Sequence, residues 1–399
     1  MITGKIRKDI QSGYSGGSTD MFIPKLLLGK KIYAYDVNSL YPYVMSNFDF
    51  PIGDPVYIEG DITNSWIEDN LFGFFYCKIT TPENIKHPIL QTHIKTKDGF
   101  RTVSPLGNWE GWYFSEELKN ALNFGYKFEI SKGYLFERKN IFKDYIEILY
   151  NLRISYDKNH PMNYIAKILM NSLYGRFGMK DDFASIHIIK KEEYLDFEYL
   201  YKGDILDFID FENYYLLRTL HEDLDSELDN QEIHNISISI AAAVTAYARI
   251  HMSKFKNNPN FPNLYYSDTD STYFDGPLPD YLINPTELGK LKLEGIYDQA
   301  LFLAPKVYAL KNNNEAIIKI KGLSKEAINN NNITIDNLAL LLKKDYKLSF
   351  NQNEWFKNIS KANINILEQI YTLQVTDSKR ELIYSKEGKL TGTKPILLQ

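Results

Sequence analysis

Cysteine is almost absent from this 399-residue sequence, in which Cys77 stands alone. A single cysteine cannot form a disulfide within the chain, and it cannot build a cysteine-based zinc site. Histidine is also sparse, and its seven copies show no HExxH motif or paired spacing. We therefore expect any catalytic metal to bind carboxylates, which favours Mg²⁺, with Mn²⁺ as an alternative, over zinc.

Long hydrophobic runs are missing as well. No apolar stretch approaches the roughly 18 residues that a membrane-spanning helix needs. The longest candidate, Ile236–Ala248, is interrupted by Ser, Thr and Tyr and is typical of a buried helix. Met1–Ile10 carries three Lys or Arg but no apolar core, so it does not resemble a signal peptide. We expect no membrane partner.

Positive charge is in slight deficit, because 46 Lys and Arg face 51 Asp and Glu, a net of −5. That balance argues mildly against a protein that coats phosphates, since nucleic-acid binders are usually basic. The deficit is concentrated in residues 181–235, where 16 acids and 4 bases give −12, whereas the remainder of the chain totals +7. We interpret 181–235 as a candidate insertion, and we expect its most acidic part, Glu222–Asp229, to be exposed.

Hydrophobic periodicity predicts a mixture of strands and helices. The predicted strands are 32–35, 72–79, 128–130, 263–267 and 271–274, with a β-rich region at 286–320. The predicted helices are 115–124, 141–156, 161–178 and 236–252, and residues 324–372 are expected to be mainly helical. Residues 39–45 are expected to be the start of a helix or a tight turn. Because the break at 157–161 has a loop composition and ends in proline, 141–178 is predicted to form a helical hairpin.

Aspartates from two distant parts of the chain are the first candidates for chemistry. Asp268 and Asp270 flank the predicted turn between two aromatic-rich strands, and Asp36 follows the strand at 32–35. Carboxylates that lie close together repel each other unless a cation bridges them. Three of them could hold two Mg²⁺ ions roughly 3.5–4 Å apart for in-line phosphoryl transfer. Taken alone, the same residues could equally be a polar turn and a helix N-cap.

One face of the predicted helix 162–178 is the second candidate. Lys167, Asn171 and Tyr174 are spaced i, i+4 and i+7, so they share that face. A cation, an amide and a phenol could grip a triphosphate and stack on a base or sugar. A solvated helix face with a half-buried tyrosine is the alternative interpretation.

Two weaker candidates lie near the ends of this region. The glycines of Gly13–Gly17 (GYSGG) would permit close contact with a phosphodiester backbone, although a flexible terminus has the same composition. If Pro305–Tyr308 is a strand, Lys306 and Tyr308 face the same side and offer a charge and an aromatic surface to a nucleic-acid strand. An ordinary half-exposed strand would look the same.

The order of these motifs resembles that of the family B DNA polymerases. Asp36–Pro42 (DVNSLYP) resembles the first polymerase motif, Lys167–Gly175 (KILMNSLYG) the second and Tyr266–Ser271 (YSDTDS) the third. Lys306–Tyr308 (KVY) is similar to the later Lys-x-Tyr motif, and Tyr14–Gly17 (YSGG) to the motif that precedes the palm. The wording of DVNSLYP and NSLYG is most similar to the protein-primed branch of phages, adenoviruses and linear mitochondrial plasmids.

The resemblance implies an α+β right-hand polymerase with palm, fingers and thumb subdomains. By position these would be a template-contacting first segment at 1–30, palm at 31–140 and 236–320, fingers at 141–180, an acidic insertion at 181–235 and thumb at 321–399. Protein-primed members have two insertions, and the one that contacts the priming protein would correspond to about 118–142. The other encloses the template in the family and would correspond to 181–235, whose acidity is unlike a DNA-enclosing loop.

The resemblance also implies a role for each matching residue. The catalytic carboxylates would be Asp36, Asp268 and Asp270, and the metal would be held by Asp36, the Val37 carbonyl and Asp270. The incoming dNTP would contact Ser39, Leu40, Tyr41, Arg153, Lys167, Asn171 and Tyr174. The primer-template DNA would contact Tyr14, Gly16, Gly17, Lys306 and Tyr308. Tyr41 would also exclude a ribonucleotide 2′-hydroxyl by steric contact.

The implied function is template-directed DNA synthesis by two-metal nucleotidyl transfer from dNTPs to a primer. A terminal protein would be a further partner if the chain replicates linear plasmid or viral DNA. Only 13 residues precede Tyr14, where family members carry a 3′–5′ exonuclease domain, so we expect no proofreading. An inactive nucleic-acid-binding polymerase remnant and a metal-dependent nuclease are the alternatives. The plasmid-like resemblance favours a mitochondrial location, with a cytoplasmic or viral one as the alternative.

Overall fold

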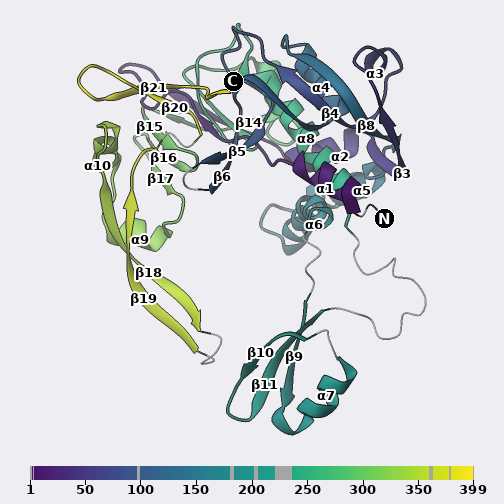
Figure 1. Ribbon diagram of the computed structural model, residues 1–399. Coiled ribbons are helices and arrows are strands. Elements are labelled where there is room, and N and C mark those ends of the chain that lie inside the picture. Colours follow the sequence, from purple (N-terminus) through teal and green to yellow (C-terminus); the bar gives the residue numbers. More distant parts are fainter. Residues whose placement is uncertain are drawn as a thin grey trace.

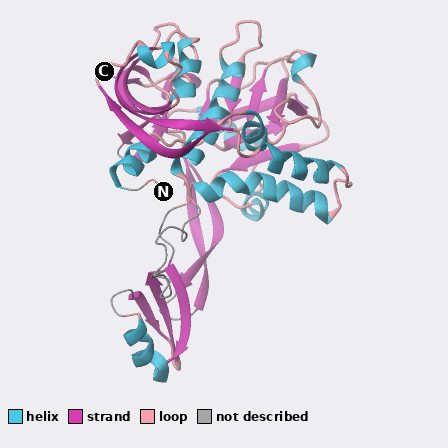
Figure 2. Cartoon of the chain, turned by 90° about the vertical axis from the view of Figure 1, so that its right-hand side faces the viewer, coloured by secondary structure: helices cyan, strands magenta, loops and turns pink. Residues whose placement is uncertain are grey.

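The structure is a computed structural model of the chain, shown in Figure 1. It describes residues 2, 4–96, 99–179, 184–201, 205–220, 236–358, 363–376 and 379–398. Helices pack between and around two five-stranded sheets in the body of the molecule, and a long β-hairpin extends away from that body (Figures 1 and 2). None of the helices in the described part of the chain is long and apolar enough to span a bilayer.

The first sheet carries the aspartates, and its strand order is β1-β12-β13-β2-β14. The strands are β1 (Asp20–Met21), β12 (Leu264–Ser267), β13 (Ser271–Phe274), β2 (Ile32–Val37) and β14 (Leu291–Tyr297). All neighbouring strands are antiparallel, and β2 lies between β13 and β14, with Asp36 opposite Ser271. The strands predicted at 32–35, 263–267 and 271–274 are therefore confirmed.

Helix α8 (Ile238–Lys256) is the central helix beside this sheet and is buried along almost all of its length. Five alanines between positions 241 and 248 keep its surface small, so other elements can approach it closely. It packs against α1 (Gly4–Ser12), α2 (Leu40–Asn47) and α6 (Pro161–Phe177). The predicted buried helix at 236–252 is confirmed.

The second five-stranded sheet has the order β22-β7-β4-β8-β3. Its strands are β22 (Leu397–Leu398), β7 (Leu106–Phe114), β4 (Gly73–Thr80), β8 (Lys127–Lys139) and β3 (Phe50–Glu59). Helices α3 (Ser65–Glu68) and α4 (Ser115–Leu122) lie beside it, and β5 (Thr92–Thr96) pairs with β6 (Gly99–Val103) as a separate hairpin. The segment 118–142 thus contributes the end of α4 and all of β8 to this part of the body.

The predicted helical hairpin is confirmed by α5 (Lys143–Ile154) and α6, which pack against each other. Pro161 occupies the first turn of α6, where its missing N–H costs nothing, and the His160 side chain accepts a hydrogen bond from the Met162 amide. The apolar residue Met170 of α6 is buried in the main core. The hairpin is therefore fixed by its own turn and by packing on the body.

The acidic segment contains a small sheet of its own. Strands β9 (Ala184–Lys190), β10 (Ile205–Asp210) and β11 (Tyr214–Leu220) pair in the order β10-β11-β9. The turn η1 (Lys191–Glu193) leads into α7 (Tyr194–Leu200), whose Phe197 ring packs on His187 of β9. The acidic stretch Glu222–Asp229 lies outside the described residues.

The C-terminal part is richer in strands than its sequence predicts. The β-rich region at 286–320 is confirmed by β14 together with β15 (Gln299–Ala304), β16 (Val307–Lys311) and β17 (Ala316–Ile320). The mainly helical prediction for 324–372 is wrong, since among the described residues of this range only α9 (Lys325–Asn330), α10 (Ile335–Ala339) and η3 (Leu340–Leu342) are helical. The strands β18 (Leu348–Asn358) and β19 (Asn363–Leu373) form the long hairpin, and β20 (Glu381–Tyr384) pairs with β21 (Leu390–Lys394).

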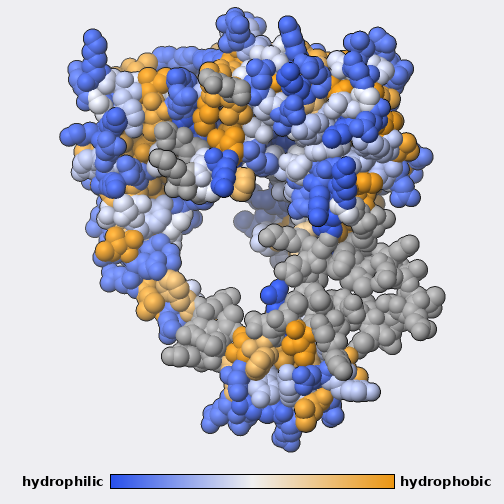
Figure 3. All heavy atoms as spheres, in the orientation of Figure 1, coloured by the Kyte–Doolittle hydropathy of each residue, from blue (hydrophilic) through white to orange (hydrophobic). Residues whose placement is uncertain are grey.

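Side-chain burial alternates over a short part of β18 near the body of the molecule. Phe350 and Gln352 of β18 are buried, whereas Asn351 between them is exposed, as expected for side chains on opposite faces. Large apolar side chains remain exposed on this hairpin, among them Trp355 and Ile370, and hydrophobic patches are visible along it in Figure 3.

Candidate active site

Asp36 and Asp270 come together where β2 meets the turn before β13. Asp36 pairs in register with Ser271, and the Val37 amide donates a hydrogen bond of 2.8 Å to the Asp270 carbonyl. Asp36 lies within a strand, so the alternative interpretation of a helix N-cap is excluded. Burial, followed by the charge of Asp270, raises the pKa of Asp36 to about 7. Burial and the charge of Asp268 raise the pKa of Asp270.

Asp268 has a different environment, because its carboxylate is surrounded by hydrogen-bond donors. It accepts from Thr19 Oγ1 at 2.8 Å, the Thr269 amide at 2.8 Å and Lys306 Nζ at 2.9 and 3.0 Å. Burial alone would raise its pKa, but the hydrogen bonds from Lys306 and Thr269 hold it below the ordinary value. Asp268 therefore ties neighbouring segments together, and it is not equivalent to the other two aspartates.

The oxygen ligands at Asp36, Asp270 and the Val37 carbonyl suit a divalent cation. No cluster of three or more His, Cys, Asp or Glu side chains suited to a metal occurs among the described residues. The charge of Asp270 nevertheless disfavours the charged form of Asp36, and the charge of Asp268 disfavours that of Asp270. Lys292 and Lys167 offset this only partly at Asp36. A cation between them would remove this penalty. Asp36, Asp270 and the Val37 carbonyl could thus hold Mg²⁺ or Mn²⁺.

The first turn of α2 follows Asp36 closely in sequence. Ser39 adopts a left-handed backbone conformation (φ 47°), and its hydroxyl accepts a hydrogen bond of 3.1 Å from Arg153 of α5. The side chain of Leu40 is buried in the core, so only its backbone can face a ligand. Leu40 and Tyr41 lie in the first turn of α2, where backbone amides have no acceptor within the helix and can bind an anion.

Helix α6 brings its predicted face toward the same place. Lys167 is close enough to Asp36 to lower that group's pKa. The Tyr174 ring stacks on Tyr41 with ring centroids 4.0 Å apart and planes 27° from parallel. Asn171 donates a hydrogen bond of 2.8 Å to the Lys167 carbonyl within its own helix. The structure thus brings Lys167 and Tyr174 to the site, whereas this hydrogen bond of the Asn171 side chain stays within α6.

Lys306 lies beside Asp268, and Tyr308 follows it on β16. Lys306 is in the turn before β16, with a left-handed backbone (φ 61°), so its predicted position on a strand is wrong. Its amide donates a hydrogen bond of 2.8 Å to the Tyr266 hydroxyl, and its ammonium group pairs with Asp268. Tyr308 is on β16 and packs against Tyr266 and Tyr273. The two residues are neighbours of the site, but they do not form one strand face.

The glycine-rich segment approaches the Asp-Thr-Asp turn from another side. A Cβ added to Gly17 would lie 2.5 Å from Thr269 Cγ2, so only glycine fits there without a shift. Gly16 faces open space, since a Cβ there would meet nothing within 4 Å. The Tyr14 hydroxyl packs against Gly178 at the end of α6. This segment therefore bridges the turn and the helical hairpin, which no single motif indicated.

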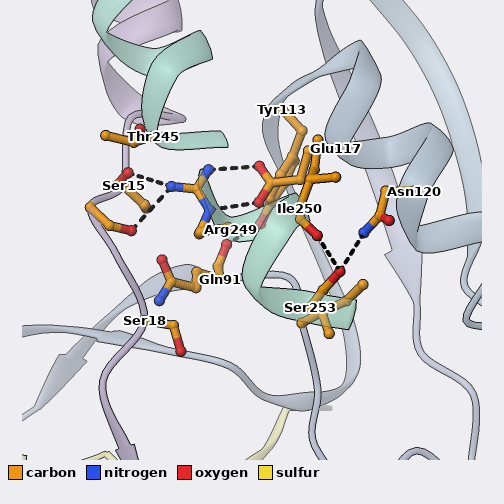
Figure 4. A network of polar contacts seen from close by, with 12 residues as sticks. Ser15, Ser18, Gln91, Tyr113, Glu117, Asn120, Thr245, Arg249, Ile250 and Ser253 are labelled. Carbon is orange, nitrogen blue, oxygen red and sulfur yellow. Dashed lines mark hydrogen bonds and ion pairs between the residues drawn. The ribbon is translucent and has the colours of Figure 1, made fainter. Parts of the chain in front are cut away.

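Sequence reasoning missed the buried ion pair that anchors this segment (Figure 4). Arg249 of α8 donates to both Glu117 oxygens at 2.6 and 2.7 Å. Its Nη1 also donates to the carbonyls of Ser15 and Gly16. The available signal was a charged residue inside an otherwise apolar helix, because an arginine there needs a partner. Thr19, which binds Asp268, carried no comparable signal.

Comparison with known proteins gives the class to which this fold and site belong. The family model described as DNA polymerase type B, organellar and viral, matches residues 1–261. The chain therefore belongs to the type B DNA polymerases of organelles and viruses.

Individual relatives agree with this assignment. The chain is 39% identical to a probable DNA polymerase of Ascobolus immersus, over 99% of this chain and 32% of the relative. It is 36% identical to a probable DNA polymerase of Neurospora intermedia, over 91% of this chain and 37% of the relative. The chain thus spans about a third of the length of these curated relatives.

Solved structures identify the fold. A ternary complex of phi29 DNA polymerase with primer-template DNA and incoming nucleotide superimposes with a TM-score of 0.65 at 18% identity, covering 94% of this chain and 63% of that one. Its binary complex with primer-template DNA gives 0.66 at 20% identity, covering 93% and 63%. The expected α+β right-hand polymerase fold is confirmed.

Proposed function

We propose that this chain carries out template-directed DNA synthesis, transferring nucleotides from dNTPs to a primer 3′-hydroxyl. The observation that carries the proposal is the pair Asp36 and Asp270 with Lys167 and the first turn of α2 around it. A nuclease would use the carboxylates, but it has no need for a cationic helix face and a stacked tyrosine beside them. Family membership supports the polymerase over that alternative.

The residues around the carboxylates divide the work of binding the substrate. Lys167 and Arg153 would neutralise the triphosphate, and the amides in the first turn of α2 would hold its oxygens. Tyr41 and Tyr174 would form the surface under the sugar and the new base pair. Mg²⁺ held by Asp36, Asp270 and the Val37 carbonyl would supply charge neutralisation and activation of the primer hydroxyl. Positioning by the fixed elements would provide much of the rate enhancement.

On the DNA side, the proposal assigns the primer to Lys306 and Tyr308 and the template to Tyr14, Gly16 and Gly17. The ion pair between Lys306 and Asp268 supports this, because it fixes a cation next to the aspartate turn. Palm, fingers and thumb are proposed at the boundaries given above, with α5 and α6 as the fingers. Four further points stay predictions: priming by a terminal protein, replication of plasmid or viral DNA, the lack of proofreading and a mitochondrial location.

Primer extension tests the proposal directly. The purified chain is given a labelled primer-template, dNTPs and Mg²⁺, beside the Asp270→Asn variant and an EDTA control. We expect extension by the wild type and a loss of at least about 10³-fold in the variant, which keeps the shape of the side chain but loses its charge. Binding of DNA without extension would indicate an inactive remnant, and shortening of the primer would indicate a nuclease.

A further inference from the structure

Asn38 has an unusual number of hydrogen bonds to one distant loop. Its side-chain Nδ2 donates to the carbonyls of Asn284 at 2.7 Å and Glu287 at 3.1 Å. Its backbone amide donates to the Lys290 carbonyl at 2.9 Å, and its carbonyl accepts from the Gly289 amide at 3.0 Å. Four hydrogen bonds therefore join this single residue to the loop 284–290.

The loop 284–290 is itself held firmly. The Asn284 side-chain oxygen accepts from the Thr286 amide at 2.9 Å, which closes the turn from inside. Gly289 has φ +78°, and a Cβ there would lie 2.3 Å from the Tyr43 ring of α2. His251 of α8 donates to the Gly289 carbonyl at 2.8 Å. We call Asn38 together with the loop 284–290 the brace.

Helix α5 contacts the brace and the residue that follows Asn38. The Tyr150 hydroxyl donates to the Thr286 carbonyl at 2.8 Å, and Arg153, one turn further along the helix, donates to Ser39 Oγ at 3.1 Å. Ser39 is the residue after Asn38 and takes the left-handed conformation that starts α2. The brace therefore joins the strand with Asp36, the first turn of α2 and the C-terminal end of α5.

We propose that Asn38 is a positioning residue for the nucleotide site. The brace fixes the Asn38 peptide against the loop and so sets the left-handed conformation of Ser39. That conformation in turn sets the direction of the Leu40 and Tyr41 amides and the tilt of the Tyr41 ring. The inference rests on the proposed function, because it assigns those groups to triphosphate and sugar. A side chain at 38 must donate two hydrogen bonds to carbonyls, which an amide does and a carboxylate cannot.

Single-nucleotide incorporation with varied dATP and Mg²⁺ tests this role. Asn38→Asp keeps the shape of the side chain but turns two donors into acceptors that face carbonyl oxygens. We expect KM for dATP to rise about 10-fold with kcat within about threefold, and discrimination against ATP to fall about fivefold. Asn47→Asp is the matched control, because the side-chain hydrogen bonds of Asn47 to described residues go to Tyr43 and Ser46 of its own helix. It should stay within about twofold of wild type.

Two outcomes would overturn the proposal: equal behaviour of Asn38→Asp and Asn47→Asp, or a fall in kcat with KM unchanged. If Asn38→Asp does not fold, Tyr150→Phe removes the donor to the Thr286 carbonyl from the other side. We expect it to raise KM about threefold, and an unchanged KM would then contradict the brace.

Hydrogen–deuterium exchange separates this proposal from the proposed function. The Gly289 amide should exchange at least about 10-fold faster in Asn38→Asp than in the wild type, whereas it should be unchanged in Asn47→Asp. This readout does not need catalysis. A wild type that fails to extend primers but shows the exchange difference would reject the polymerase function alone, and equal exchange in all three proteins would reject the brace.

Discussion

Tyr41 shows how one side chain can serve both packing and specificity. It lies in the first turn of α2, and its ring stacks on Tyr174 of α6. Burial, together with the nearby Tyr174, raises the pKa of its hydroxyl well above the ordinary range, so the phenol stays neutral. A neutral, flat ring held between two helices is a rigid surface, and a rigid surface can reject a substituent that a mobile side chain would accommodate.

Replacement of Tyr41 by Ala should therefore weaken sugar discrimination. Without the ring, a 2′-hydroxyl has space, and one excluded group is worth roughly 10- to 100-fold in the ratio of kcat/KM for dATP and ATP. Single-turnover incorporation of each nucleotide measures this ratio. Tyr41→Phe keeps the ring and should retain the wild-type ratio, so an unchanged ratio in Tyr41→Ala would contradict the role assigned to the tyrosine.

At the scale of elements, the parts that could be predicted from sequence were those with local signals. The helical hairpin has its own proline-containing break, and the Asp-Thr-Asp turn sits between two aromatic strands. The β18–β19 hairpin was missed, because its asparagine-rich sequence alternates only weakly and its stability depends on pairing. Long-range contacts carried even less signal: Thr19 and Asp268, which share a hydrogen bond, are 249 residues apart.

The Arg249–Glu117 pair joins α8, α4 and the glycine-rich segment. Its loss should therefore lower both the stability of the fold and the affinity for DNA. The two side chains are only 6% and 5% exposed, and Arg249→Ala would leave a buried carboxylate without its partner. We expect the free energy of unfolding to fall by about 3–5 kcal/mol in urea titrations. The affinity for primer-template should fall too, because the carbonyls of Ser15 and Gly16 lose their donor.

The double variant Arg249→Met, Glu117→Leu separates these effects. Apolar residues of similar size can replace a buried ion pair at little cost, so most of the stability should return. The affinity for primer-template should stay low, since methionine cannot hold the Ser15 and Gly16 carbonyls. Recovery of both quantities, or of neither, would contradict this division of roles.

At the scale of the whole molecule, charge is separated by segment, and a net value of −5 hides the separation. The small sheet of β9, β10 and β11 belongs to the acidic segment 181–235, whose net charge is −12. The remaining chain totals +7 and contains β2 with Asp36, the Asp268–Asp270 turn, α6 and the glycine-rich segment. The deficit that seemed to argue against nucleic acid therefore lies apart in sequence from every residue assigned to DNA.

Two buried histidines should make the stability of the molecule depend on pH. Burial, and next the charge of Arg380, lowers the pKa of His87 to about 3. Burial, and next the charge of Lys254, lowers the pKa of His251 to about 4. The Nδ1 atoms of both rings have no hydrogen-bond partner in the described part of the chain, in agreement with buried neutral imidazoles. An unfolded histidine has a pKa of about 6.5.

Between pH 6.5 and 4 the unfolded chain therefore binds more protons than the folded one, and stability is lost as the pH falls through this window. From pH 7.5 to 5 each histidine should remove about 2 kcal/mol from the free energy of unfolding, at about 1.4 kcal/mol per pKa unit. Asp36, whose raised pKa acts in the opposite direction, contributes equally to proteins that differ only at a histidine. We therefore compare the wild type with His251→Gln, whose side chain can still donate to the Gly289 carbonyl, in urea titrations at pH 7.5 and 5. Between these pH values the free energy of unfolding should fall by about 2 kcal/mol less in the variant than in the wild type. Equal losses would mean that His251 is not held neutral by the fold.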